Sequence, residues 1–194
     1  MYGEFELIDR IAALFETPEG LTLGIGDDCA ILDPGRFDLV TTDTMVETVH
    51  FRTDWSAPAD VGWKAIAACM SDIAAMGGGP GAFFLNLSLG DGVDENYVDQ
   101  LLDGMKQACD ELTPESFEVA AGGGDVTSSP GPTVITVTML GEASPAGPVT
   151  RSGALPGDRI ALLGATGAAA AAVQLLSGTL DASAADYADL VSHH

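Results

Sequence analysis

The stretch PADVGWKAIAACMSDIAAMGGGPGAFFLNLSL, residues 58–89, predicts a buried helix followed at once by a strand. Pro58 stands where proline favours the first turn of a helix, and the run of glycines before Pro80 ends that helix. The residues between them are almost all apolar or small, so we expect the helix to be buried on several sides. The segment 81–89 then has the composition of a strand.

Segments on either side extend this pattern of helices and strands. The expected elements are an amphipathic helix at 3–15, two short strands within 29–44 around a turn at 33–35, a helix with an acidic face at 94–112, an apolar run at 117–121 that leads into glycines, and a β-branched strand at 133–143. This order predicts an α/β (α+β) fold, with a mixed sheet and helices on one face.

The composition changes after the last of these strands. Residues 144–158, SPAGPVTRSGALPGD, are rich in turn formers and predict a boundary between a domain at 1–145 and a second domain at 146–194. In the second domain we expect a strand at 158–164 and an alanine-rich helix at 166–178. Because that piece is too short to be stable alone, it predicts an incomplete α/β domain that a partner or a longer chain would complete.

The charge of the chain is extreme. Seven basic and 29 acidic residues give a net charge of −22, while 46% of the residues are apolar. We therefore expect no binding to nucleic acid or to an anionic membrane through a basic face, and a folded rather than disordered chain. An acidic surface suits the salt-rich cytoplasm of a halophilic organism.

Other bulk features favour a cytoplasmic protein. No run approaches the roughly 20 apolar residues that a membrane helix needs, and the first residues carry acids where an export signal needs basic residues. The three cysteines are widely spaced, without a CxxC pair, which argues for a reducing compartment and against structural zinc.

Four aspartates stand apart from the surface acids because their neighbours are apolar or small: Asp28, Asp43, Asp72 and Asp125. If the fold brings them together, each pair 4 Å apart repels by about 4 kcal/mol at an effective dielectric constant of 20. Such a cluster could not stay ionised without cations, or else some of its members would take up protons. Hard oxygen ligands beside threonine hydroxyls suit Mg²⁺ that bridges to phosphate. The alternative, that these acids cap helices and turns, stays open on spacing alone.

Phosphate handling would have to rest on metals and backbone. The turns GIGDD and GGGD offer backbone N–H groups, but the chain has neither a P-loop nor a GxGxxG fingerprint. Arg151 is the candidate guanidinium that clamps a phosphate. His50, the one histidine away from the chain end, is either structural or functional, and Cys69 is expected to be a small core residue.

Taken in order, these segments resemble the thiamine-monophosphate kinase family, in the superfamily of aminoimidazole ribonucleotide synthetase. VHF after TTDT, and the lack of a reactive cysteine ahead of GDD, separate it from selenophosphate synthetase and the hydrogenase-maturation relative. The stretches that carry the resemblance are GEFELI (3–8), GIGDDCAIL (24–32), TTDTMVETVHF (41–51), WKAIAACMSDIAAMGGGP (63–80), GGGD (122–125) and TRSGALPGD (150–158).

The resemblance implies a PurM-like N-terminal domain that dimerises through its sheet, and phosphorylation of thiamine monophosphate by ATP. The reaction would be a direct in-line transfer that uses Mg²⁺, commonly with K⁺, and forms no covalent enzyme intermediate. By the same resemblance His50 faces the substrate, and Gly124, Asp125 and Arg151 meet the nucleotide. The implied metal ligands are Asp28, Thr41, Thr42, Asp43, Asp72 and Asp125.

Two departures leave alternatives open. The family often has Asn where Cys69 stands, and it continues into a second domain with a DxSDG-type motif and a GGEDY stretch, neither of which occurs here. One alternative is a sister ATP-dependent synthetase of the hydrogenase-maturation or selenophosphate-synthetase type. The other is a non-catalytic, nucleotide-binding dimerisation fragment.

Overall fold

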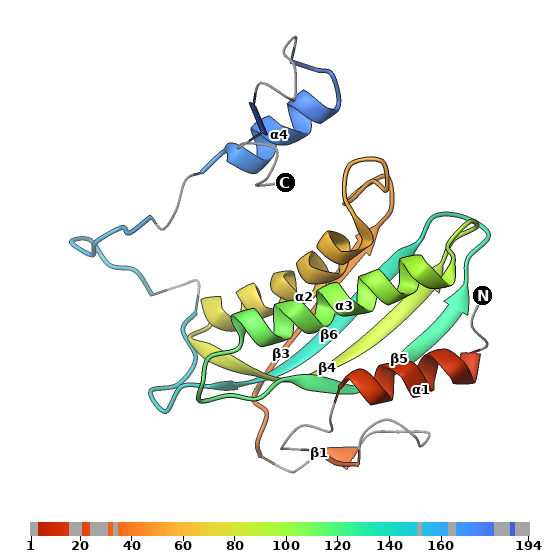
Figure 1. The fold of residues 1–194 in the computed structure, drawn as a ribbon. Coiled ribbons are helices and arrows are strands. Elements are labelled where there is room, and N and C mark those ends of the chain that lie inside the picture. Colours follow the sequence, from red (N-terminus) through yellow and green to blue (C-terminus); the bar gives the residue numbers. More distant parts are fainter. Residues whose placement is uncertain are drawn as a thin grey trace. The chain divides into compact units, whose positions relative to one another are not determined.

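The structure, a computed structural model, describes residues 4–15, 21–23, 31–32, 35–150, 153–162, 166–180 and 187–188. The chain consists of two compact units, Met1–Thr150 and Arg151–His194. The first unit holds the sheet and three helices (Figure 1). The roles expected for the two domains remain predictions.

A four-stranded mixed sheet organises the first unit, with the strand order β3-β6-β4-β5. The long β4 lies parallel to β5, and β6 lies antiparallel to both β3 and β4. The parallel pair needs a crossover, which α3 provides. The mixed sheet expected from the sequence is confirmed; its strands are β3 (Leu39–Val46), β4 (Gly78–Leu89), β5 (Ala120–Ser128) and β6 (Val134–Ala143).

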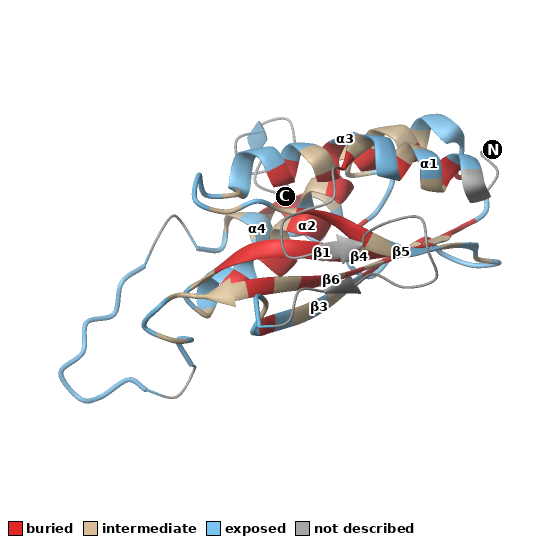
Figure 2. Cartoon of the chain, turned by 90° about the horizontal axis from the view of Figure 1, so that it is seen from below, coloured by how far each residue is buried: buried red, intermediate tan, exposed pale blue. Residues whose placement is uncertain are grey.

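Three helices lie on one face of this sheet: α1 (Glu4–Leu14), α2 (Pro58–Ala75) and α3 (Glu95–Leu112). Figure 2 shows α1 and α3 on one side of the strands, with the buried residues between the two layers. Pro58 begins α2, as expected. Asp94 caps α3, because its side chain accepts a hydrogen bond of 2.8 Å from the N–H of Tyr97. The expected layer of helices on one face is confirmed.

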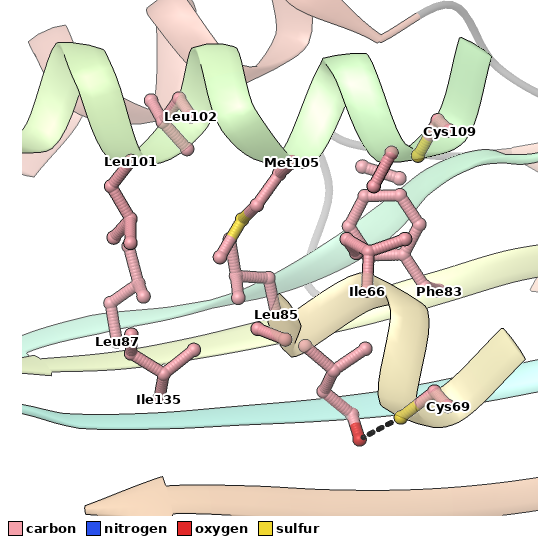
Figure 3. Close-up of a cluster of buried hydrophobic side chains, with 14 of the residues drawn as sticks. Ile66, Cys69, Phe83, Leu85, Leu87, Leu101, Leu102, Met105, Cys109 and Ile135 are labelled. Carbon is pink, nitrogen blue, oxygen red and sulfur yellow. Dashed lines mark hydrogen bonds between the residues drawn. The ribbon is translucent and has the colours of Figure 1, made fainter. Parts of the chain in front are cut away.

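The core lies between the helices and the sheet (Figure 3). Burying each of its large side chains contributes about 1.5–3 kcal/mol. Phe15, just after α1, packs edge-to-face on Phe83, with ring centroids 5.3 Å apart. The side chains exposed by 1% or less include Ile66, Phe83, Leu87, Leu101, Leu102, Met105 and Ile135.

Glycines set how closely α2 and α3 approach. A Cβ atom on Gly62 would lie 2.0 Å from the carbonyl oxygen of Leu101, and one on Gly104 would lie 1.9 Å from that of Ala59. Real Cβ atoms essentially never come within 3.0 Å of such atoms. The two helices therefore touch backbone to backbone at these two glycines.

The two strands expected within 29–44 exist but do not pair with each other. β2 (Ile31–Leu32) pairs antiparallel with β1 (Leu21–Leu23), which the sequence did not indicate, while β3 pairs with β6. The reason is the alternation of β3, which places Leu39 and Met45 in the core beside the buried residues of β6.

In the second unit, α4 (Ala168–Leu176) confirms the expected alanine-rich helix, with Ala172 and Leu175 buried. The strand expected at 158–164 is wrong over residues 158–162, which have no regular secondary structure. The described residues of this unit contain no strand with which residues 158–162 could pair, and an unpaired strand leaves its backbone groups without partners.

No helix in the described part of the chain is long and apolar enough to cross a membrane.

Candidate functional site

Strand β3 divides its candidate residues between the two faces of the sheet. Thr41 and Asp43 lie on the same face of the strand as the buried Leu39 and Met45, which is the face toward the helices. Thr42 points to the other face, where it accepts a hydrogen bond of 3.0 Å from the hydroxyl of Thr138 on β6. Two of the three TTD residues therefore face α2, and one does not.

Asp72, near the end of α2, meets the helix side of β3. The hydroxyl of Thr41 donates a hydrogen bond of 2.7 Å to Oδ2 of Asp72. Cys69, one helical turn earlier, donates from Sγ to the carbonyl oxygen of Val137 at 3.3 Å, the dashed line in Figure 3. Val137 is the β6 partner of Asp43. Thr41, Asp43 and Asp72 thus gather at one place, which we call the β3–α2 cluster.

The pKa of the Cys69 thiol depends on the carboxylates around it. The pKa of its thiol is raised to about 12, chiefly by burial and in part by the negative charges of Asp43 and, to a lesser extent, Asp72. Both carboxylates therefore lie close to the sulfur. The thiol is fully buried and stays protonated near neutral pH, so Cys69 is a core residue and not a nucleophile.

Asp125 lies at the opposite edge of the sheet. Its partner on β4 is Asn86, which in turn is paired with Thr136 on β6, and Thr136 with Thr44 on β3. These side chains form a row on the face away from the helices, since the next residue, Val126, packs against the core.

The distance between the outer strands separates the candidate metal ligands. Three strand spacings place β5 about 14 Å from β3, whereas two ligands of one Mg²⁺ ion each lie about 2.1 Å from it. A single chain therefore brings Asp43 and Asp72 together, with Thr41, but does not bring Asp125 to them. Thr42 shares the face of Asp125 and not that of the β3–α2 cluster.

Gly124 has a packing role that the sequence did not reveal. A Cβ atom at this position would lie 1.9 Å from the carbonyl oxygen of Leu85, so any side chain would push β5 away from β4. The close approach of these two strands is a sufficient reason for a glycine at this position, so no bound ligand is needed to explain it. A contact of Gly124 with the nucleotide stays a prediction.

His50 lies in the turn that follows β3, residues 46–51. Its Nδ1 accepts a hydrogen bond of 3.1 Å from the N–H of Val46, and its side chain is exposed. Nζ of Lys64 donates to the carbonyl oxygen of His50 at 3.1 Å. Lys64 was not among the residues that the sequence singled out. Its position eight residues before Asp72 was nevertheless a signal that both lie on one side of the same helix, because residues four and eight apart share a helix face.

Two predicted residues, Asp28 and Arg151, lie outside the described residues. Within the described ranges, no group of three or more His, Cys, Asp and Glu residues could hold a metal ion. The β3–α2 cluster nevertheless offers two carboxylates and a hydroxyl, which are the hard oxygen ligands that Mg²⁺ prefers. Its donor set fits part of a magnesium site that takes further ligands from elsewhere.

The chain matches the family model of AIR synthase related protein, N-terminal domain, over residues 26–143. It is 35% identical over 175 residues to a thiamine-monophosphate kinase of Bacillus subtilis, covering 89% of this chain and 52% of the relative. It is 38% identical over 198 residues to that of Escherichia coli K12, covering 99% and 58%. The chain thus spans a little more than half the length of these curated relatives.

Solved structures agree with this fold. A thiamine monophosphate kinase of Aquifex aeolicus matches with a TM-score of 0.69 and 33% identity, over 80% of this chain and 50% of that one. A complex of AaThiL with AMPPCP and TMP matches with a TM-score of 0.70 and 32% identity, over 99% and 58%. Because the family model matches residues 26–143, which are more than half of the chain, the chain belongs to the family of AIR synthase related proteins and carries their N-terminal domain.

Proposed function

We propose that this protein phosphorylates thiamine monophosphate with ATP and produces thiamine diphosphate. The observation that supports the proposal is the β3–α2 cluster, together with His50 in the turn that directly follows strand β3. Such an arrangement can hold the metal-bound phosphates of a nucleotide at one point and a second substrate at the next. The Escherichia coli relative, which matches over 99% of this chain, is named a thiamine-monophosphate kinase, and AaThiL, which matches over 99% too, was solved with AMPPCP and TMP.

The proposed chemistry is a direct in-line transfer that depends on charge and positioning. Asp43 and Asp72, with Thr41, are the residues of this chain that would hold Mg²⁺, and Asp28 is proposed to join them. When bound, the metal neutralises the negative charge of the phosphates. His50 contacts thiamine monophosphate, and Gly124, Asp125 and Arg151 contact the nucleotide. No side chain forms a covalent intermediate.

A homodimer is part of the proposal. Asp125 is separated from the β3–α2 cluster by the width of the sheet, so a second copy is needed if both are to serve one site. The face away from the helices offers a surface for such pairing, since Thr42, Thr44 and the 69%-exposed Val40 point to it. Sedimentation of the purified chain at two concentrations tests this, and a monomer at both would contradict it.

The remaining parts of the proposal concern ions and location. K⁺ is proposed as a second cation of the reaction, and the cytoplasm of a halophilic organism as the setting. The net charge of −22, which a salt-rich solution screens, supports the setting. The resemblance to the thiamine-monophosphate kinases supports K⁺.

Production of ADP tests the activity directly. We expect ADP formation that requires thiamine monophosphate and Mg²⁺. ADP formation that requires another phosphorylated or acyl substrate in place of thiamine monophosphate would favour a sister synthetase. Mg²⁺–ATP binding without turnover in any mixture would leave a non-catalytic binding domain and reject the proposed activity.

One variant tests the metal assignment. Asp72→Asn should weaken Mg²⁺–ATP binding in a calorimetric titration, because it removes one of the two gathered carboxylates. The apo protein should be as stable as before or more so, since like charges then repel less. Asp103→Asn, an exposed residue of α3, is the matched control and should bind as the unaltered protein does. Equal affinity of Asp72→Asn and its control would reject the assignment.

A further inference from the structure

The turn that carries His50 is bonded to itself and to the sheet. The N–H of Thr48 donates to the carbonyl oxygen of Phe51 at 2.7 Å, and that of His50 donates to the carbonyl oxygen of Val46 at 2.8 Å. Glu47 anchors the start of the turn, because its Oε2 accepts a hydrogen bond of 3.1 Å from the N–H of Thr133, next to β6. The turn is therefore a preformed element and not a free loop.

The contact of His50 with Val46 determines where the imidazole carries its proton. A backbone N–H can only donate, so Nδ1 of His50, at 3.1 Å from the nitrogen of Val46, must be an unprotonated acceptor. The neutral ring then carries its proton on Nε2. An exposed His50 consequently offers an N–H donor at the outer edge of the ring.

Lys64 ties this turn to helix α2. Its ammonium donates to the carbonyl oxygen of His50 at 3.1 Å, so the same residue that offers the donor is held at its backbone. A charged donor makes a stronger hydrogen bond than a neutral one. The chain has only one other lysine, Lys106, which forms an ion pair with Asp110 on α3.

The position of Lys64 argues against a direct role at the metal-bound phosphates. Lys64 and Asp72 are eight residues apart on α2, which places them about 12 Å apart along the helix axis. Lys64 lies at the His50 end of β3 and Asp72 lies at the Thr41 end. The two residues thus lie at different ends of the helix side of β3.

We propose that Lys64 is a positioning residue that holds the 46–51 turn against α2, so that His50 presents its Nε2–H to a hydrogen-bond acceptor of the second substrate. This inference rests on the proposed function for the identity of that substrate. The acceptor is a phosphate oxygen or a ring nitrogen, because a neutral N–H group recognises either.

Three variants of the protein test the inference. Lys64→Met keeps the aliphatic stem and removes the donor, Lys64→Arg restores a charged donor, and Lys106→Met is the control for losing a positive charge elsewhere. We expect Lys64→Met to raise KM for thiamine monophosphate about tenfold. KM for ATP and the melting temperature should stay close to those of Lys106→Met, and Lys64→Arg should recover most of the loss.

Nitrogen-15 NMR of the histidine ring gives a readout that is independent of turnover. The unaltered protein should show His50 as the Nε2–H tautomer, and Lys64→Met should show a mixture of both tautomers. An unchanged His50 spectrum in Lys64→Met overturns the inference, whether or not ADP is formed. A rise in KM for ATP that matches the rise for thiamine monophosphate overturns it too, since it would place the ammonium at the phosphates. If no variant forms ADP but the tautomers shift, the proposed substrate fails while the positioning of His50 by Lys64 stands.

Discussion

Thr48 occupies a backbone conformation that its side chain disfavours. Its φ of 70° lies in the left-handed region, and it is the one non-glycine residue with a positive φ in the described part of the chain. This region costs an L-residue about 1–2 kcal/mol, and a β-branched residue such as threonine fits it worst. Thr48→Gly should remove that cost and keep the backbone hydrogen bond to Phe51.

The opposing effect of the substitution is smaller. Glycine gains freedom in the unfolded chain, which costs about 0.4–1 kcal/mol of stability. The balance is a stabilisation of about 0.5–1 kcal/mol, or about 1–4 °C in melting temperature for a domain of this size. Calorimetry or circular dichroism measures it directly.

Val49→Gly is the matched control. Val49 is the next residue of the same turn, also β-branched and 71% exposed, but its φ is not positive. This variant carries the entropy cost without relief of strain, so its melting temperature should fall. If Thr48→Gly melts at or below the unaltered protein, or falls together with Val49→Gly, strain at Thr48 is refuted.

Three further predictions concern packing, pH and salt. Gly104→Ala should lower the free energy of unfolding, measured in urea, by about 1–3 kcal/mol, because its Cβ atom would lie 1.9 Å from a backbone oxygen. Gly131→Ala is the control and should change this free energy very little, because the nearest atom to its Cβ lies 3.8 Å away. Burial raises the pKa of Cys69, Cys109 and Tyr97 to about 12, above their ordinary values of 9.0, 9.0 and 10.0, so the unfolded chain releases these protons first. Stability should be complete below pH 9 and fall as the pH rises from 9 to 12; a urea midpoint that is flat over this range would contradict it. Added KCl should raise the melting temperature into the molar range by screening the net charge of −22, and a flat or falling curve would count against this.

Local signals in the sequence were sufficient for most helices and strands. Helix α2 begins at the predicted Pro58 and ends before the predicted glycines, and β4 and β6 follow from their apolar and β-branched runs. These elements were predictable because capping, period and turn chemistry act between residues that are near in the chain. The family motifs were readable for the same reason, since each is a short contiguous stretch.

Tertiary structure decided which of the candidate residues meet. The sequence placed Asp43, Asp72 and Asp125 in similar surroundings, but only the pairing of β3 with β6, about 95 residues later, puts Asp43 and Asp125 at opposite edges of one sheet. The same long-range contacts bring Lys64 to His50 and Thr41 to Asp72. Strand order and helix packing are chosen by burial of the whole apolar face, a sum over distant segments that no local pattern contains. The sequence alone therefore determined which residues can bind metal or phosphate. The folded sheet determined that Thr41, Asp43 and Asp72 meet in the β3–α2 cluster, whereas Asp125 lies apart from them at the other edge.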